Sequence, residues 1–306
     1  LQRCNLRGRW PRKTRWNYWA VSSESHLFSV TVSHVDYVGL VFIYVADFEK
    51  DEFNEVTQLL PFGRGIELPE TAAKDVHFAA GGLQVALKQA EAGLELAVEM
   101  ANFEGVPLSA RISVTKPHNH ETLNVVIPWD ERTFQFTSKQ NTLPAAGTVR
   151  LGSQTIEFGG EQSFACLDFG RGIWPRDCKW NWGSASGTQG EHIVGLNLGG
   201  QWTDGTGYTE NGICINGQLT KISEELRWEY DKNDFMGLWR IAAPSGAVDL
   251  YFRPIMERVA KSDLWLVKSE VHQLFGHYSG TVRTAAGQEI AVDRLLGWAE
   301  DHVALW

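Results

Sequence analysis

Residues Leu94–Met100 read LELAVEM, and residues Leu108–Val114 read LSARISV. Apolar and polar side chains alternate along both stretches with a period of two. Such alternation is typical of strands in antiparallel sheets that bury one face and leave the other in water. The same pattern covers most of His26–Ser33, and shorter cases occur at Thr148–Leu151 and Ala247–Leu250. It therefore predicts an all-β protein.

Turn-forming pairs separate these stretches and support the same fold class. Asn216-Gly217 lies between two apolar stretches, which is a strong signal for a β-hairpin. Helical signals are few: Pro69–Lys74 could form one turn, and Ala86–Ala92 is compatible with a helix. Many strands joined by short turns indicate antiparallel barrels or sandwiches.

The length of 306 residues permits one large domain or two of about 150 residues. A polar stretch, Thr137–Pro144, precedes a segment rich in Trp and Gly. We therefore expect two β domains, 1–150 and 151–306, with the binding pocket in the second.

Composition excludes some classes of function. The formal net charge of −9 disfavours nucleic acid as a partner of the whole chain. Residues 3–15 nevertheless hold six basic side chains and no acid. They could form an arm that binds nucleic acid or an anionic surface, or a solvated edge whose charges pair with acids elsewhere.

Other signals concern location and cofactors. The four cysteines form no CxxC pair, which predicts free thiols in a reducing compartment. No apolar run approaches the ~20 residues that span a bilayer, and no signal peptide is visible, so we expect a cytoplasmic protein without an integral membrane segment. Nucleotide-binding motifs are absent from the sequence, so no cofactor is predicted.

Two segments rich in Trp and Gly, Asp168–Ser184 and Gly199–Gly212, are the candidates for a lined pocket. In the first, Arg171 and Arg176 could hold an anionic or polarised group, and Asp177 could act as general acid or base. The alternative is an ion pair between Asp168 and Arg171, with the guanidinium stacked on a neighbouring tryptophan.

In the second segment, Asp204 and Glu210 could form the carboxylate pair of a glycosidase, although the adjoining glycines are equally typical of turns. Elsewhere, His118 and His120 could share a metal ion or simply lie in a turn. Near the end of the chain, Glu300–His302 could relay a proton or belong to an exposed terminal strand.

The chain resembles the family catalogued as domain of unknown function 2804, over nearly its whole length. This family implies a cytoplasmic bacterial protein with no assigned activity. It is similar to a lipocalin-like group that contains carotenoid hydratases and tocopherol cyclase, which implies two calycin-like β domains with a ligand cavity. The segments that carry the resemblance are Lys13–Trp19, Thr137–Gly147, Asp168–Pro175, Trp180–Gly187, Gly195–Gly212, His277–Gly280 and Gly297–Trp306.

The chain differs from those enzymes at the positions of their catalytic acids. Their catalytic carboxyl groups belong to a Trp-Met-Asp-x-Glu-Trp-Gly-like segment, which aligns with Lys179–Gly183. Lys179 and Asn181 then stand where the related enzymes have acids. The resemblance therefore gives more support to a functional site at this segment than to acid-catalysed hydration.

We expect proton-transfer chemistry on a small, largely apolar ligand, of hydratase, isomerase or cyclase type. The alternatives are a non-catalytic carrier of a hydrophobic metabolite and a carbohydrate-active enzyme, so the sequence leaves open whether the protein is catalytic. The expected acid–base residue is Asp177, with Glu210 as second choice and Arg176 polarising the ligand. The expected ligand-binding residues are Trp174, Trp180, Asn181, Trp182, Trp202, Arg171 and Tyr208.

Overall fold

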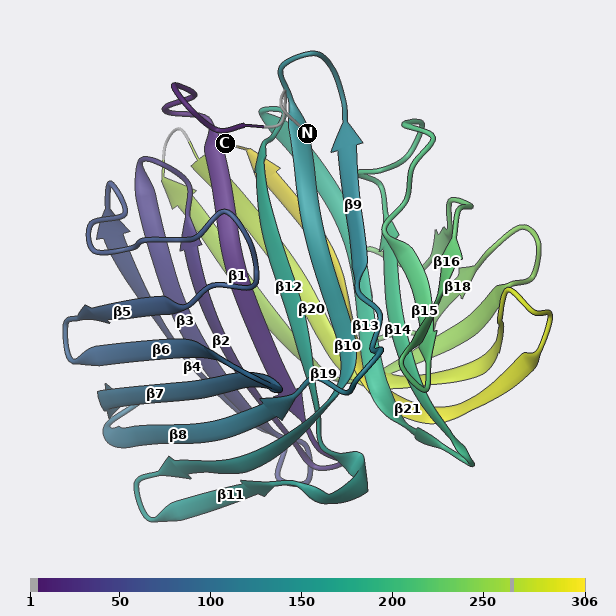
Figure 1. Cartoon of the computed structure of the whole chain (residues 1–306), viewed down its shortest axis with the longest axis horizontal. Helices are drawn as coiled ribbons and strands as arrows, with labels where there is room; N and C mark the ends of the chain where they lie inside the picture. Colours follow the sequence, from purple (N-terminus) through teal and green to yellow (C-terminus); the bar gives the residue numbers. More distant parts are fainter. Residues whose placement is uncertain (1–4, 265–266, 306) are drawn as a thin grey trace. The chain divides into compact units, whose positions relative to one another are not determined.

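The computed structural model describes residues 5–264 and 267–305 and is built almost wholly from strands (Figure 1). Within these residues there are twenty-one strands, one short 3₁₀ turn at Gly160–Gln162 and no α-helix. Neighbouring strands with a described register all pair antiparallel, so the predicted all-β fold class is confirmed. Across the same residues, no helix has the length and apolar character needed to cross a bilayer.

The chain forms two compact units, and it passes between them more than once. The first unit is Leu1–His120 with Thr137–Ile173, and the second is Glu121–Phe136 with Trp174–Trp306. Residue 150 lies in a strand of the first unit. The expected division into domains 1–150 and 151–306 therefore stays a prediction, which fragments of these lengths can test.

The sheet of the first unit runs in the order β4-β3-β2-β1-β12-β10-β8-β7-β6-β5, with β11 beside β10. Strand β9 (Leu123–Pro128), from the second unit's segment, precedes β10 in the chain and also pairs with it. The other bounds are β1 (Lys13–Ser22), β2 (His26–His34), β3 (Val38–Asp47), β4 (Glu52–Pro61), β5 (Val76–Ala80), β6 (Leu83–Ala90), β7 (Gly93–Phe103), β8 (Val106–Thr115), β10 (Phe134–Leu151), β11 (Gln154–Phe158) and β12 (Phe164–Ile173).

This first sheet curls, because β5–β8 run at a large angle to β1–β4 (Figure 1). The inward side chains are apolar and almost wholly buried, as at Val30, Ile43, Val85, Leu96 and Ile112. The strict alternation of the predicted strands is confirmed in β7 and β8, where buried and exposed residues follow one another.

The sheet of the second unit runs in the order β16-β15-β14-β13-β21-β20-β19-β18-β17. Its last strand in the chain, β21, therefore lies inside the sheet, between β13 and β20. The bounds are β13 (Asp177–Gln189), β14 (His192–Gly200), β15 (Asn211–Ile215), β16 (Gln218–Ile222), β17 (Arg227–Glu229), β18 (Trp239–Ala242), β19 (Val248–Leu264), β20 (Val267–Arg283) and β21 (Glu289–Leu305).

The interior of this second sheet is filled by its own side chains. Leu196, Trp239, Leu250, Phe252 and Tyr278 are each completely buried in one apolar cluster. Burial of such side chains contributes about 1.5–3 kcal/mol each, which makes this cluster the main source of the unit's stability.

Local predictions had mixed outcomes. The hairpin at Asn216-Gly217 is confirmed: both residues have positive φ, as a two-residue turn of this kind requires, and they join β15 to β16. The helix considered at Ala86–Ala92 is wrong, because Ala86–Ala90 belongs to β6. Pro69–Lys74 forms bends and a turn instead of a helical turn. Cys166, Cys178 and Cys214 are buried and form no disulfide bond within the described part of the chain, and Cys4 lies outside it.

Candidate functional site

An open cleft of about 610 Å³ lies in the second unit. Strands β19, β20 and β21 and the loop between β17 and β18 supply its walls. Charged and apolar side chains share this one hollow, which suits a ligand that has both characters. The lining residues are Lys232, Asn233, Asp234, Phe235, Met236, Glu257, Glu270, His272, Asp301 and Val303.

Strand register places three polar residues in one row across the sheet. Asn181 of β13 is opposite Asp301 of β21, and Asp301 is opposite His272 of β20. Side chains of directly opposed residues in antiparallel strands point to the same face, with Cβ atoms about 4.5–5.5 Å apart. The row therefore joins an amide, a carboxylate and an imidazole from distant parts of the chain. Asn181 is the direct neighbour of a carboxylate on the next strand.

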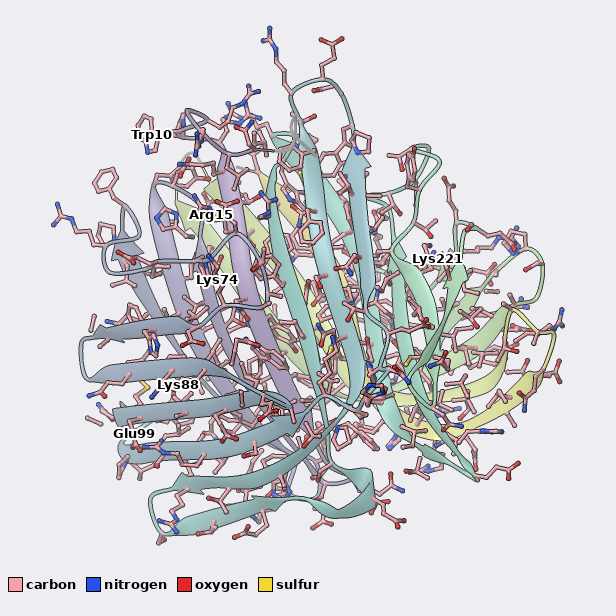
Figure 2. The ribbon with its side chains drawn as sticks, in the orientation of Figure 1. Trp10, Arg15, Lys74, Lys88, Glu99 and Lys221 are labelled. Carbon is pink, nitrogen blue, oxygen red and sulfur yellow. The ribbon has the colours of Figure 1, made fainter. Side chains whose placement is uncertain are left out.

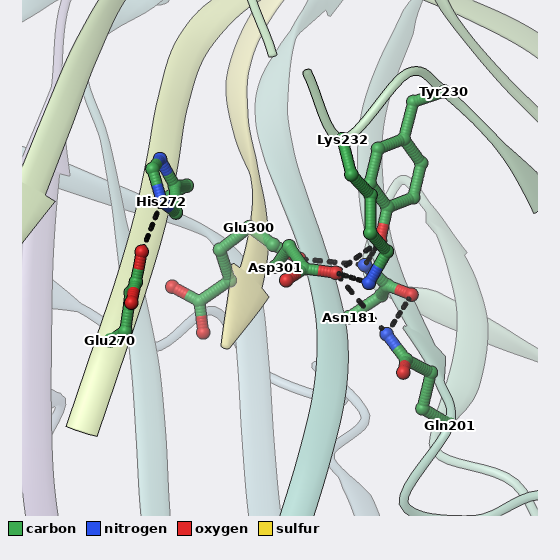
Figure 3. A network of polar contacts seen from close by, with 8 residues as sticks. All are labelled: Asn181, Gln201, Tyr230, Lys232, Glu270, His272, Glu300 and Asp301. Atoms are coloured by element: carbon green, nitrogen blue, oxygen red, sulfur yellow. Dashed lines mark hydrogen bonds and ion pairs between the residues drawn. The ribbon is translucent and has the colours of Figure 1, made fainter. Parts of the chain in front are cut away.

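Asp301 is the centre of a hydrogen-bond network (Figure 3). It is only 5% exposed. Its Oδ2 accepts from the hydroxyl of Tyr230, from Lys232 Nζ at 2.9 Å and from Gln201 Nε2 at 3.4 Å. Charge-assisted bonds of this kind are short and strong, so the carboxylate is fixed in position at the edge of the cleft.

The hydroxyl of Tyr230 is held in its protonated form. Burial raises its pKa, and the hydrogen bond to Asp301 raises the pKa further. Asn181 Nδ2 donates to the same hydroxyl oxygen at 2.9 Å, and Gln201 Nε2 donates to Asn181 Oδ1 at 2.7 Å. The phenolic hydrogen therefore points to Asp301, because the amide already occupies the acceptor side of the oxygen.

The loop that carries Tyr230 and Lys232 is fixed by aromatic packing. The ring of Tyr230 stacks on that of Trp239, with centroids 3.8 Å apart and planes inclined by 7°. Trp239 Nε1 donates to the carbonyl of Phe235 at 2.8 Å, and the backbone N–H of Asn233 donates to Asp231 Oδ1 at 2.8 Å. Trp239 itself is completely buried. This loop therefore presents its polar groups from a rigid support.

His272 lies between two carboxylates. Its Nδ1 is 2.7 Å from Glu257 Oε1, and its Nε2 is 3.1 Å from Glu270 Oε1. Each ring nitrogen therefore has a carboxylate oxygen as its hydrogen-bond partner. Lys261, 2.6 Å from Glu270, lowers the pKa of that carboxyl group together with His272. The ring of Phe235 stacks on His272 with centroids 4.1 Å apart.

The next residue of β21, His302, has other partners. Its ring lies 3.8 Å from that of Trp180, and its Nε2 is 2.8 Å from Ser269 Oγ. Burial lowers the pKa of His302 to about 3, with a further lowering by Arg258, so its ring is neutral. The expected exposed terminal strand is wrong here, because β21 lies between β13 and β20 and both Glu300 and Asp301 are buried.

Three of the tryptophans expected in the pocket do lie together. Trp174 lies 5.4 Å from both Trp180 and Trp202 between ring centroids, and Trp129, which no sequence signal singled out, completes the group at 5.1 Å from Trp174. Trp182 belongs to a separate pair with Trp298, at 5.5 Å. The group of four indoles is an aromatic cluster with a specific geometry, and its role in binding stays a prediction.

Glu210, the second-choice acid, is 2% exposed beside this cluster. Its Oε1 accepts from Trp202 Nε1 at 2.7 Å. A Cβ on Gly199 would lie 2.4–2.9 Å from the Glu210 side chain, so only glycine leaves room for this carboxyl group. Asp204, its expected partner in a carboxylate pair, is exposed. The two carboxyl groups are therefore in opposite environments.

The other expected residues are dispersed. Arg176, Asp177 and Tyr208 are exposed residues of the second unit, and Tyr208 is 54% exposed. Arg171 lies in the first unit.

The ion pair weighed between Asp168 and Arg171 is wrong. Asp168 pairs with Lys139 at 2.8 Å, and Arg171 pairs with Glu70 at 2.9 Å. The guanidinium of Arg171 therefore neutralises a carboxylate on another segment of the first unit.

The two candidate metal ligands do not share a site. His120 is buried and its Nε2 is 2.9 Å from Thr142 Oγ1, whereas His118 is exposed in a turn. Over residues 5–264 and 267–305, no group of three or more His, Cys, Asp or Glu side chains is arranged to hold a metal ion.

Tyr230, Lys232 and His272 carry no sequence signal of a site. Their neighbours in the chain form no motif, and the contacts arise only when β13, β20 and β21 pair in register. Asp301 did have a signal, because it lies between Glu300 and His302 in the acidic cluster near the end of the chain.

These two curled antiparallel sheets define an all-β protein of the lipocalin-like class. The model of the family described as domain of unknown function (DUF2804) matches residues 1–306, and the chain belongs to this family. The resemblance expected from the sequence is thereby confirmed. No curated protein matches the chain.

Solved structures are similar to the chain at low sequence identity, and the first of them has the same fold. A protein of Nitrosomonas europaea described as AttH is 12% identical, with a TM-score of 0.51 over 96% of this chain and 92% of its own. CghA with Sch210972 has a TM-score of 0.49 at 11% identity, over 96% and 88% of the two chains. Kievitone hydratase from Nectria haematococca has a TM-score of 0.48 at 8% identity, over the same shares.

Proposed function

We propose that the protein is a cytoplasmic enzyme that transfers a proton on a small amphipathic molecule bound in the cleft of the second unit. Hydration, isomerisation and cyclisation are the reaction types that such chemistry includes. The observation that carries the proposal is the row of Asp301 and His272, in which a carboxyl group and an imidazole ring lie side by side on the cleft face.

The two groups have complementary roles. Asp301 accepts a proton from the substrate, since its carboxylate lines the cleft and its Oδ2 is held by Tyr230 and Lys232. We assign His272 as the group that donates a proton to the opposite end of the reacting bond, because its imidazole lines the cleft directly opposite Asp301 and has a carboxylate oxygen at each ring nitrogen. Tyr230 is a positioning residue that acts through Asp301, because its raised pKa makes it a hydrogen-bond donor rather than a base.

The lining of the cleft supports an amphipathic ligand. Phe235, Met236 and Val303 offer apolar surface beside the charged groups, and Met236 is 43% exposed. The interior of the sheet is already filled by residues such as Leu250 and Phe252, so the structure gives more support to a ligand in this cleft than to one carried inside the sheet.

This proposal moves the acid–base role away from the residues expected first. Asp177 and Arg176 are exposed at the start of β13, and Glu210 is bound to Trp202 beside the aromatic cluster. Their catalytic roles, and the ligand-binding roles of the tryptophans, remain proposals that the same assay can compare with Asp301.

Proton transfer can be detected before the substrate is known. The purified protein is incubated with a small-molecule extract in D₂O, and mass spectrometry identifies compounds that gain deuterium or the mass of water. We expect Asp301→Asn to lower the rate for such a compound by ~10²-fold or more, and His272→Gln to lower it similarly.

The matched control is Asp249→Asn, which removes a carboxylate of β19 that pairs with Arg240. It should retain the wild-type rate. If Asp301→Asn and His272→Gln also retain it while Asp177→Asn or Glu210→Gln does not, the site lies elsewhere and the assignment to this cleft is wrong.

A further inference from the structure

The basic stretch found near the start of the sequence lies at one end of the first sheet. Strands β1 and β3 begin at this end, and β2 and β4 finish there, because all four pair antiparallel in sequence order. Three turns therefore project from the same end: residues 5–12, 35–37 and 62–65. Arg12 lies close enough to Tyr37 to affect its pKa, and the N–H of Phe62 donates to the carbonyl of Tyr37 at 2.8 Å.

These turns expose two large hydrophobic side chains. Trp10 is 65% exposed and Phe62 is 62% exposed, more than any other large hydrophobic residue that the structure describes. Figure 2 shows Trp10 projecting from its turn. Single exposed apolar residues need no explanation, but two on adjoining turns form a pair that can enter an apolar phase together.

Four arginines lie in the same turns. The exposed or partly exposed arginines of the three turns are Arg7, Arg9, Arg12 and Arg64. The sole acid in the same turns is Asp36, which is buried and accepts from Lys13 at 3.2 Å. These three turns therefore carry a net positive charge, although the whole chain carries a net charge of −9.

The turn that presents Phe62 is held rigidly. Phe62 has φ 58°, a left-handed conformation that is costly for a bulky side chain. A Cβ on Gly63 would lie 2.1 Å from the ring of His34, so this glycine packs directly on β2. The N–H of Ile66 donates to the carbonyl of Gly63 at 3.0 Å. The backbone is thus fixed in a strained shape that keeps the aromatic ring in solvent.

We propose that this end of the first unit docks on an anionic phospholipid surface. Trp10 and Phe62 enter the headgroup layer, where amphipathic and aromatic rings are favoured. Arg7, Arg9, Arg12 and Arg64 bind lipid phosphates, which guanidinium groups match in shape and charge. The projecting turns suit a flat layer of headgroups. A nucleic-acid strand is bound in a positive groove rather than on projecting turns.

The test is sedimentation of the whole protein with vesicles of phosphatidylcholine, with or without phosphatidylglycerol. We expect binding only to the anionic vesicles at low salt, and its loss near ~0.5 M salt, where charges are screened within a few ångströms. The variant R7Q/R9Q/R12Q/R64Q should weaken partitioning more than ~100-fold. The variant W10S/F62S should weaken it by ~10-fold or more.

Two controls match these changes. R111Q/R132Q/R150Q/R227Q removes four exposed arginines elsewhere, and L238S/Y251S removes two exposed apolar side chains of the second unit. Both should bind like wild type, and circular dichroism should show that all variants are folded. The proposal is overturned if wild type does not sediment with anionic vesicles, if the control arginines matter equally, or if only a single-stranded oligonucleotide binds.

Discussion

Adjacent residues of β21 have opposite electrostatic surroundings. Asp301 faces Tyr230 and Lys232, which donate hydrogen bonds to its carboxylate. His302 instead contacts the ring of Trp180, where burial lowers its pKa to about 3. One strand therefore stabilises an anion on the face of the cleft and disfavours a cation one residue further along.

The lowered pKa of His302 makes the protein sensitive to mild acid. An unfolded histidine has a pKa of ~6.5, so the unfolded chain binds one more proton than the folded chain between about pH 6.5 and pH 3. The free energy of unfolding therefore falls as the pH falls through this window. His302→Gln removes the titrating group and retains a partner for Ser269.

We expect this variant to lose less stability than wild type between pH 7 and pH 5, by at most about 2 kcal/mol. Urea unfolding at both pH values measures the difference. Equal losses in the two proteins would show that His302 is not held neutral in the folded state.

The site residues illustrate what a sequence can predict at this scale. Trp174, Trp180, Trp182 and Trp202 were predicted to line one pocket; the ring of Trp174 does contact those of Trp180 and Trp202, whereas Trp182 pairs with Trp298. Tyr230 and His272 were not predicted, because their contacts depend on which strands pair and in which register. A side chain's local sequence carries no information on its neighbour across the sheet.

At the scale of the strands, the close approach of neighbouring backbones requires glycine at particular positions. A Cβ on Gly297 of β21 would lie 2.3 Å from the carbonyl oxygen of Ser184 and 2.6 Å from the Cβ of Ala185 on β13. Real Cβ atoms do not approach backbone this closely, so β13 and β21 can pair here only if residue 297 is glycine.

Gly297→Ala should therefore separate β13 from β21 locally and destabilise the protein by about 1–3 kcal/mol. Thermal and urea unfolding measure this loss. Ala291→Thr, at an exposed position of the same strand, is the control and should change stability by less than about 0.5 kcal/mol. A neutral result for Gly297→Ala would contradict the described register of β13 and β21.

The strands differ in how clearly the sequence predicts them. Leu94–Met100 alternates over a full strand length and was predicted correctly. Ala86–Ala92 is short and rich in Ala, Leu and Lys, which favour helices, yet pairing with β5 and β7 overrides this preference in β6. Short segments with weak periodicity take their conformation from their partners.

For the whole molecule, the order of strands determines which fragments can fold. In the first sheet β12 (Phe164–Ile173) lies between β1 and β10. A fragment ending at residue 150 lacks this central strand, whereas a fragment ending at residue 173 contains it. The amphipathic alternation revealed the strands but not their order, since pairing between β1 and β12 joins residues far apart in the chain.

We expect the fragment of residues 1–173 to give a more dispersed NMR spectrum and a more cooperative unfolding transition than the fragment of residues 1–150. Both are compared at the same protein concentration. If the 1–150 and 151–306 fragments each fold cooperatively, the division first expected from the sequence is supported and the dependence on β12 is contradicted.

The place of β21 inside its sheet has a consequence for protein synthesis. A ribosome releases the chain from the amino end, and the first sheet has all its strands once Ile173 has emerged. The second sheet must wait with an unfilled gap between β13 and β20 until the chain is made as far as Leu305. The carboxylate of Asp301 arrives on the strand that closes this gap, so the row of Asp301 and His272 forms only when β21 joins the sheet.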